Sequence, residues 1–140
     1  MKVRIGPYRK NRAERIEIEP FDTWSMDYTL AMIVLPMLKQ LKETKHGAPA
    51  VEFQDVPEEL HPPEEQVSKL YTHGETDDNY FKRWDWVLDE MIYAFDSKVN
   101  KDEVYMRFDI ATERDAMQKE QDRISNGFKL FGKYYESLWD

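Results

Sequence analysis

The 140-residue sequence contains no cysteine and no long run of apolar residues. Without cysteine, a disulfide framework, a thiolate metal site and a cysteine nucleophile are all excluded. The longest apolar stretch, around residues 30–37, is too short to cross a bilayer, so we expect no membrane span. Lys2 and Arg4 interrupt any apolar segment at the start of the chain, so we also expect no signal peptide.

Common enzyme motifs are also missing. With only five glycines, the sequence has neither a Gly-rich phosphate-binding loop nor a Gly-x-Ser-x-Gly elbow. Asp85 and Asp89 lie four residues apart, as acid–base pairs can, but no nucleophile or metal motif accompanies them. We interpret them as ion-pair partners of Lys82 and Arg83 on one helix. We therefore expect no catalytic residues and no enzymatic activity.

The histidines do not form a metal-binding motif. His61 and His73 each lie near glutamates in a charged, proline-rich stretch, but no helical His-x-x-x-His pair is present. Stretches of this composition are usually solvated. We predict no metal site and no cofactor.

Acidic residues outnumber basic ones, by 28 to 20, and the net charge is -8. This balance is unfavourable for duplex DNA, whose binding depends on Lys and Arg. The excess lies in residues 48–78, which hold nine acids and one base, whereas residues 1–20 hold six bases and three acids. The overall acidity therefore does not exclude a small anionic ligand bound near a local group of bases.

Hydrophobic residues make up 41% of the chain, which at this length indicates one folded domain covering residues 1–140. Alternating apolar and polar residues within 1–20 predict a β-hairpin with turn residues in its middle. A hairpin alone is marginal in water, so it should pack on helices or join another chain's sheet. Residues 21–47 predict a helix that begins at Asp22 or Thr23, ends at Gly47 and is apolar on most sides, hence central and buried.

Residues 48–78 contain four prolines and predict an acidic loop, with one short helical turn around residues 64–71. Residues 79–140 predict two more helices. The first of these helices ends near Ser97. The second begins near Lys101 or Ile110 and continues toward Trp139. At Asn126-Gly127 this second helix is either broken or merely weakened by the glycine. The predicted fold class is α+β, mostly α: an N-terminal hairpin packed on three main helices, with an acidic proline-rich loop.

The helix over residues 79–97 carries aromatic residues on two faces. A core stripe recurs at helical spacing at Phe81, Trp84, Leu88, Met91 and Phe95. Trp86 and Tyr93 fall on the opposite, polar face, which indicates a second packing layer, an oligomer contact or a ligand platform. The candidate oligomer contacts, which include the aromatic C-terminus, are Trp86, Tyr93, Phe131, Tyr134, Tyr135 and Trp139.

A second pattern combines bases with tryptophan. Guanidinium groups bind phosphates and aromatic rings stack on bases, so this composition suits a nucleotide, although solvated bases beside an interface tryptophan would give the same pattern. The candidate ligand-binding residues are Lys82, Arg83, Trp86, Lys42, Lys45 and His46.

Four stretches together resemble a family of small uncharacterised proteins of tailed bacteriophages. They are DTWSMD (22–27) leading into LPMLKQLK (35–42), KHG with DVPE (45–47 and 55–58), FKRWDWVLDEMI (81–92), and NGFKLFGKYY with the terminal LWD (126–135 and 138–140). The resemblance covers residues 22–140 and implies a phage protein located in the cytoplasm of an infected bacterium. It implies no defined activity.

Small phage proteins without catalytic residues are commonly accessory factors, which gives a class-level expectation only. The first hypothesis is a non-enzymatic protein that acts in host interaction or counter-defence, as a homo-oligomer that sequesters a signalling nucleotide. The alternatives are an inhibitor that binds a host protein through its acidic segment, and a minor virion protein.

Overall fold

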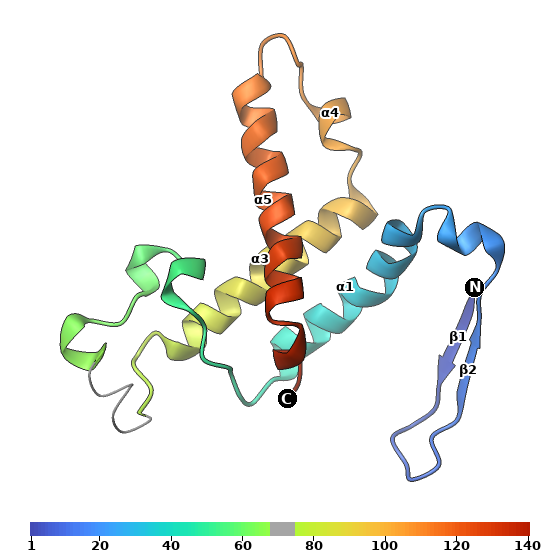
Figure 1. Ribbon diagram of the computed structural model, residues 1–140, viewed down its shortest axis with the longest axis horizontal. Coiled ribbons are helices and arrows are strands. Elements are labelled where there is room, and N and C mark those ends of the chain that lie inside the picture. The colour runs from blue at the N-terminus through green and yellow to red at the C-terminus, as the bar shows by residue number, and fades with distance from the viewer. Residues whose placement is uncertain (68–74) are drawn as a thin grey trace.

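The computed structural model describes residues 1–67 and 75–140. Three helices, α1 (Met26–Thr44), α3 (Tyr80–Asn100) and α5 (Arg114–Lys133), form the centre of the molecule, and the short α4 (Val104–Arg107) joins the last two (Figure 1). A two-stranded hairpin, β1 (Lys2–Ile5) with β2 (Glu14–Glu17), precedes them. The predicted fold class, mostly α with a small β part, is confirmed.

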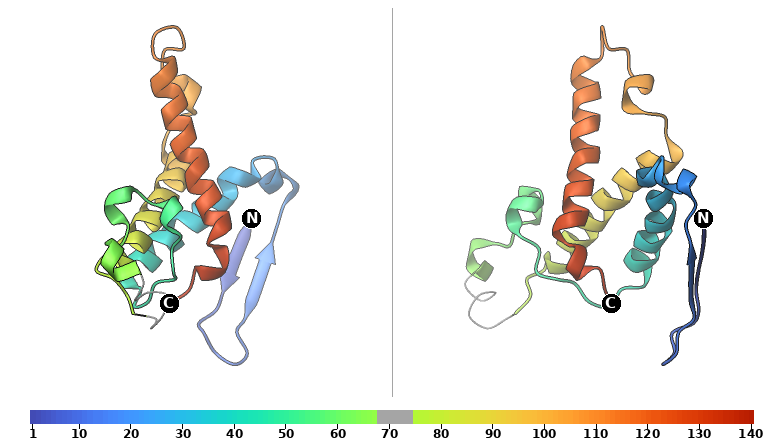
Figure 2. Two further views of the ribbon diagram at one scale, coloured as in Figure 1. Left: turned by 60° about the vertical axis from the view of Figure 1, so that its left-hand side comes forward. Right: turned by 45° about the vertical axis from the view of Figure 1, so that its right-hand side comes forward.

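The hairpin is antiparallel, with Val3 opposite Ile16 and Arg4 opposite Arg15. This register puts the apolar side chains on one face and Lys2, Arg4 and Arg15 on the other. The strands stand away from the helices, and nearly every strand residue is exposed (Figure 2). The expectation that the hairpin packs on the helices of its own chain is therefore wrong.

The first helix is shorter and more exposed than its apolar sequence predicts. A 3-10 turn, η1 (Pro20–Thr23), comes first, and α1 ends at Thr44, before Gly47. Only Ala31, Leu35 and Leu38 are buried, whereas Trp24 is 83% exposed. Because α1 has a helical neighbour on one side only, much of its apolar circumference is left at the surface.

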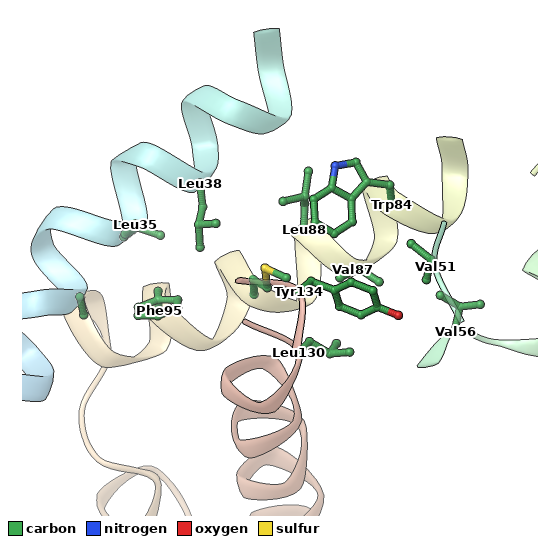
Figure 3. Packing of buried hydrophobic residues seen from close by; sticks show 12 residues of the cluster. Leu35, Leu38, Val51, Val56, Trp84, Val87, Leu88, Phe95, Leu130 and Tyr134 are labelled. Carbon is green, nitrogen blue, oxygen red and sulfur yellow. The ribbon is translucent and has the colours of Figure 1, made fainter. Parts of the chain in front are cut away.

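The core lies where α3 packs between α1 and α5. Trp84, Val87, Leu88 and Met91 are completely buried, so most of the predicted stripe is confirmed, but Phe81 at the start of α3 is exposed. Figure 3 shows Tyr134 and Leu130 from the C-terminal region packing against this part of α3. The core therefore joins segments from both halves of the chain.

Helices α3 and α5 cross at Gly127, and α5 passes through Asn126-Gly127 without a break. A Cβ atom at Gly127 would lie 2.4 Å from the backbone oxygen of Glu90 and 2.6 Å from the Cβ atom of Ala94. Because Gly127 has no side chain, α3 and α5 can approach this closely. The close packing offsets the low helix propensity of glycine. Residues 108–113 separate α5 from α4, so the later of the two predicted starts, near Ile110, is the closer one, and α5 ends at Lys133 instead of continuing to Trp139.

The acidic segment is better packed than its composition predicts. It contains the 3-10 turns η2 (Phe53–Asp55) and η3 (Glu58–Leu60), and residues 64–67 are helical. Val51 and Val56 belong to the main core (Figure 3). The rest of the helical turn predicted over residues 64–71, together with His73, lies outside the described residues.

Candidate functional site

The two groups of bases predicted from the sequence do approach one another, because α1 and α3 lie side by side. Each lysine, however, meets a carboxylate of α3: Lys42 Nζ lies 2.5 Å from Asp89 Oδ1, and Lys45 forms an ion pair with Asp85. Asp85 and Asp89 are therefore ion-pair residues as expected, but with partners on α1 instead of Lys82 and Arg83. Lys82 is exposed at the surface.

Arg83 is a structural residue, which corrects its assignment to a ligand site. Its side chain is only 2% exposed and forms a bidentate ion pair with Asp77, whose side chain is 0% exposed. Nη1 also donates to the Leu60 carbonyl at 2.9 Å, and the guanidinium lies 5.1 Å from the centre of the Phe53 ring. The hydrogen bonds from Arg83 hold the pKa of Asp77 below its usual value. These contacts anchor the acidic segment on α3.

His46 contacts the C-terminal residue. Its backbone N–H and its ring Nδ1 both contact Asp140, with 2.9 Å between Nδ1 and Oδ2. The hydrogen bond from the backbone N–H of His46 is the main cause of a lowered pKa at Asp140. His46 therefore joins the end of α1 to the chain terminus.

Trp86 and Tyr93 form a second packing layer, the first of the three interpretations above. Trp86 is half-buried against the main core. The Tyr93 hydroxyl donates to Glu120 at 2.7 and 2.8 Å, and Arg123 lies 3.5 Å from the centre of its ring. The hydrogen bond to Glu120 raises the pKa of Tyr93. Trp86 therefore packs at the edge of the main core, and Tyr93 contacts residues of α5.

The aromatic C-terminus divides between core and surface. Tyr134 is buried; its hydroxyl donates to Asp55 Oδ2 at 2.6 Å and accepts the Glu52 N–H at 3.0 Å. Burial, with the bond to Asp55, raises the pKa of Tyr134 to about 12. Tyr134 is thus an internal contact, which corrects its place among the interface candidates. Tyr135 and Trp139 are 65% and 63% exposed and keep that place.

An apolar groove lies between α1 and the C-terminal turn η4 (Tyr135–Ser137). It has a volume of about 790 Å³ and is lined mainly by apolar side chains, among them Val34, Met37, Leu41 and Phe131. Met37 is 65% exposed at its rim. The groove could not be recognised in the sequence, because it forms between segments about ninety residues apart. The spacing of Val34, Met37 and Leu41 on one helical face was the available signal.

The acidic segment presents two kinds of carboxylate. Glu52 and Asp55 both contact Lys133, at 2.7 and 2.6 Å, and Asp77 is buried with Arg83. The remaining ones are exposed, and none forms an ion pair with any residue in 1–67 or 75–140. These residues, named here the acidic surface, are Glu58, Glu59, Glu64, Glu65, Glu75 and Asp78.

The structure gives no sign of a metal centre or a membrane segment in the part of the chain it describes. There, three or more His, Asp or Glu side chains nowhere gather as metal ligands. The described helices are also too short or too polar to cross a membrane.

The chain matches no protein-family model, no curated protein and no solved structure.

Proposed function

We propose that this chain is a non-enzymatic binding protein that docks its acidic surface on a basic surface of a host protein. The observation that carries the proposal is a contrast in pairing. Lys42, Lys45 and Arg83 of the candidate ligand site are held by carboxylates of the same chain, whereas the six acidic-surface carboxylates have no ion-pair partner among the described residues. Unpaired charge of one sign on one surface attracts a partner of the opposite sign.

The support of the acidic surface on the core strengthens the proposal. Val51 and Val56 are buried in the main cluster, and the Arg83–Asp77 pair holds the other end of the segment. A surface held in this way loses little conformational entropy on binding. The resemblance to tailed-phage proteins adds the biological setting of the proposal, which is counter-defence in an infected bacterium.

Sequestration of a nucleotide has weaker support. A phosphate group would have to displace Asp85 and Asp89 from Lys45 and Lys42, and Arg83 is inaccessible. This version remains a prediction that calorimetry tests directly. The protein is titrated with cyclic dinucleotides and with ADP-ribose at millimolar concentration. Heat of binding that is lost in a Lys42→Met/Lys45→Met variant would favour nucleotide sequestration over the protein-binding version.

Charge neutralisation tests the protein-binding version. One variant converts Glu58, Glu59, Glu64 and Glu65 to glutamine. The matched control removes the same number of exposed carboxylates elsewhere, by Glu43→Gln, Asp115→Asn, Asp122→Asn and Glu136→Gln. The partner is identified by cross-linking in infected cells, purified, and its affinity for both variants is measured by calorimetry.

We expect binding to weaken about tenfold or more in the first variant and to fall with added salt, because the interaction is electrostatic. The control should retain most of the affinity. Equal loss in both variants would attribute binding to bulk charge, and unchanged binding in both would exclude the acidic surface; either result overturns the proposal.

A further inference from the structure

The hairpin has an apolar face that none of the described residues of its own chain covers. The register and the alternation of side chains put Met1, Val3, Ile5, Ile16 and Ile18 on this face, with Glu14 opposite Ile5 at its edge. The exposed fractions of these five apolar residues lie between 36% and 59%. A two-stranded hairpin is marginally stable in water unless its apolar face packs against something. The hairpin therefore needs an apolar partner surface.

The junction with η1 holds the hairpin in its projecting position. Both ends of the hairpin bind the carboxylate of Asp22: the N-terminal amine of Met1 lies 2.9 Å from Oδ2, and the Glu19 N–H donates to the same oxygen at 2.8 Å. The Asp22 N–H donates in return to the Glu19 carbonyl at 3.0 Å. These contacts fix the hairpin on η1.

The same chain carries a second apolar surface, which residues 1–67 and 75–140 leave exposed. Met26, Leu30, Val34, Met37 and Leu41 recur at spacings of three and four, so they share one face of α1. This α1 face is more than 40% exposed at Met26, Leu30 and Met37, and its C-terminal half borders the groove. The hairpin and α1 thus each expose an apolar surface that a partner could cover.

The total exposed area is large enough to form an interface. The accessible surface is 10435 Å². A typical monomer of 16.9 kDa exposes about 7,700 Å², so the excess is about 2,700 Å². Stable complexes bury about 800 Å² per partner and obligate homodimers more. The excess therefore exceeds what one subunit of a stable dimer must bury.

We propose that the partner is a second copy of this chain, and that the hairpin of each subunit packs its apolar face on the α1 face and groove of the other. Two-fold symmetry makes the exchange reciprocal, so the complementary pair of surfaces is used twice. The contact is apolar, so added salt does not weaken it, unlike docking through the acidic surface. The two proposals stand or fall independently.

Sedimentation equilibrium tests the dimer with two methionine variants. Met37 and Met106 are both 65% exposed, Met37 at the groove and Met106 in α4. We expect Met37→Glu to weaken dimerisation about 30-fold or more, as loss of an interface anchor does, and Met106→Glu to leave it unchanged. A wild-type chain that stays monomeric at every concentration, or equal effects of both variants, would overturn the proposal.

Cross-linking tests which segments meet, and the absence of natural cysteine makes it specific. Chains carrying Ile16→Cys are mixed with differently tagged chains carrying Met37→Cys, and a short bismaleimide is added. We expect a cross-link between the two tags. A cross-link that forms only within one chain carrying both substitutions would show that the hairpin covers its own groove, and a dimer without the cross-link would place the interface elsewhere. Both results contradict the proposal.

Discussion

The two ends of this molecule use the same kinds of residue to opposite effect. Where α3 crosses α5, four large side chains are completely buried, and a buried ion pair and the side-chain-free Gly127 fit the segments together. At the N-terminal end, a hairpin with an equally apolar face and a helix with a wider apolar circumference remain exposed. The hydrophobic pattern of a helix or strand therefore determines which of its faces can be buried. That face is buried only where another segment packs on it.

Breaking the Arg83–Asp77 pair should have the largest effect on the packed end. Arg83→Met leaves the Asp77 carboxylate buried without a counterion, so we expect the free energy of unfolding to fall by about 3–5 kcal/mol. Lys42→Met breaks a partly exposed pair and should cost no more than about 1 kcal/mol. Urea unfolding measures both changes, and similar costs would contradict the structural role of Arg83.

The Arg83–Asp77 pair also makes the free energy of unfolding depend on pH. Because folding lowers the pKa of Asp77, its contribution is fully present above the usual aspartate pKa of 3.8 and is lost as the pH falls through the lower folded-state value. We therefore expect the stability of the wild type to decrease below about pH 4. Asp77→Asn should remove part of that decrease, which urea titrations at several pH values detect.

Substitution of the two glycines of α5 should give the next largest difference in the free energy of unfolding. Gly127→Ala puts a Cβ atom against the backbone of α3, so overpacking should cost about 1–3 kcal/mol in spite of the better helix propensity of alanine. Gly132→Ala meets nothing within 4 Å and should stabilise the protein by up to about 1 kcal/mol. Thermal unfolding should give opposite signs, and the same sign in both would contradict the crossing geometry.

Substitution of two valines should give the smallest difference in the free energy of unfolding, and it compares the two ends of the molecule directly. Val87 is completely buried and Val3 is 43% exposed. Measured in the Met37→Glu background, where the proposed dimer is weakened, Val87→Thr should cost about 1–3 kcal/mol for a buried hydroxyl. Val3→Thr should remain within about 0.5 kcal/mol. Comparable losses would mean that the hairpin packs within its own chain.

The helices and the hairpin were predictable, because periods of 3.6 and 2 are local properties. The stripe Trp84, Leu88, Met91 and Phe95 is buried as its spacing predicts. Phe81 was placed in the same stripe but is exposed, because it lies at the start of α3, where none of the described elements covers it. Periodicity identifies a face and does not say whether something packs on it.

The candidate ligand site was less predictable, because several of its bases have partners that are far away in the sequence. Lys42 and Asp89 are 47 positions apart, and His46 and Asp140 are 94 apart. Tyr134 looked like an interface aromatic until the fold brought Asp55 and Glu52 to its hydroxyl. Composition located the charges correctly, but their neutralisation depends on long-range contacts.

The sequence by itself determined the secondary structure, the concentration of acidic charge in residues 48–78 and the amphipathic character of the hairpin, all of which follow from local order along the chain. Only the tertiary structure decided that Lys42 and Lys45 of α1 pair with carboxylates of α3, that Arg83 is buried, that Gly127 permits the helix crossing, and that the hairpin and the α1 face are exposed. The physical reason is that pairing and burial depend on which segments meet in space, and these segments are far apart in the sequence.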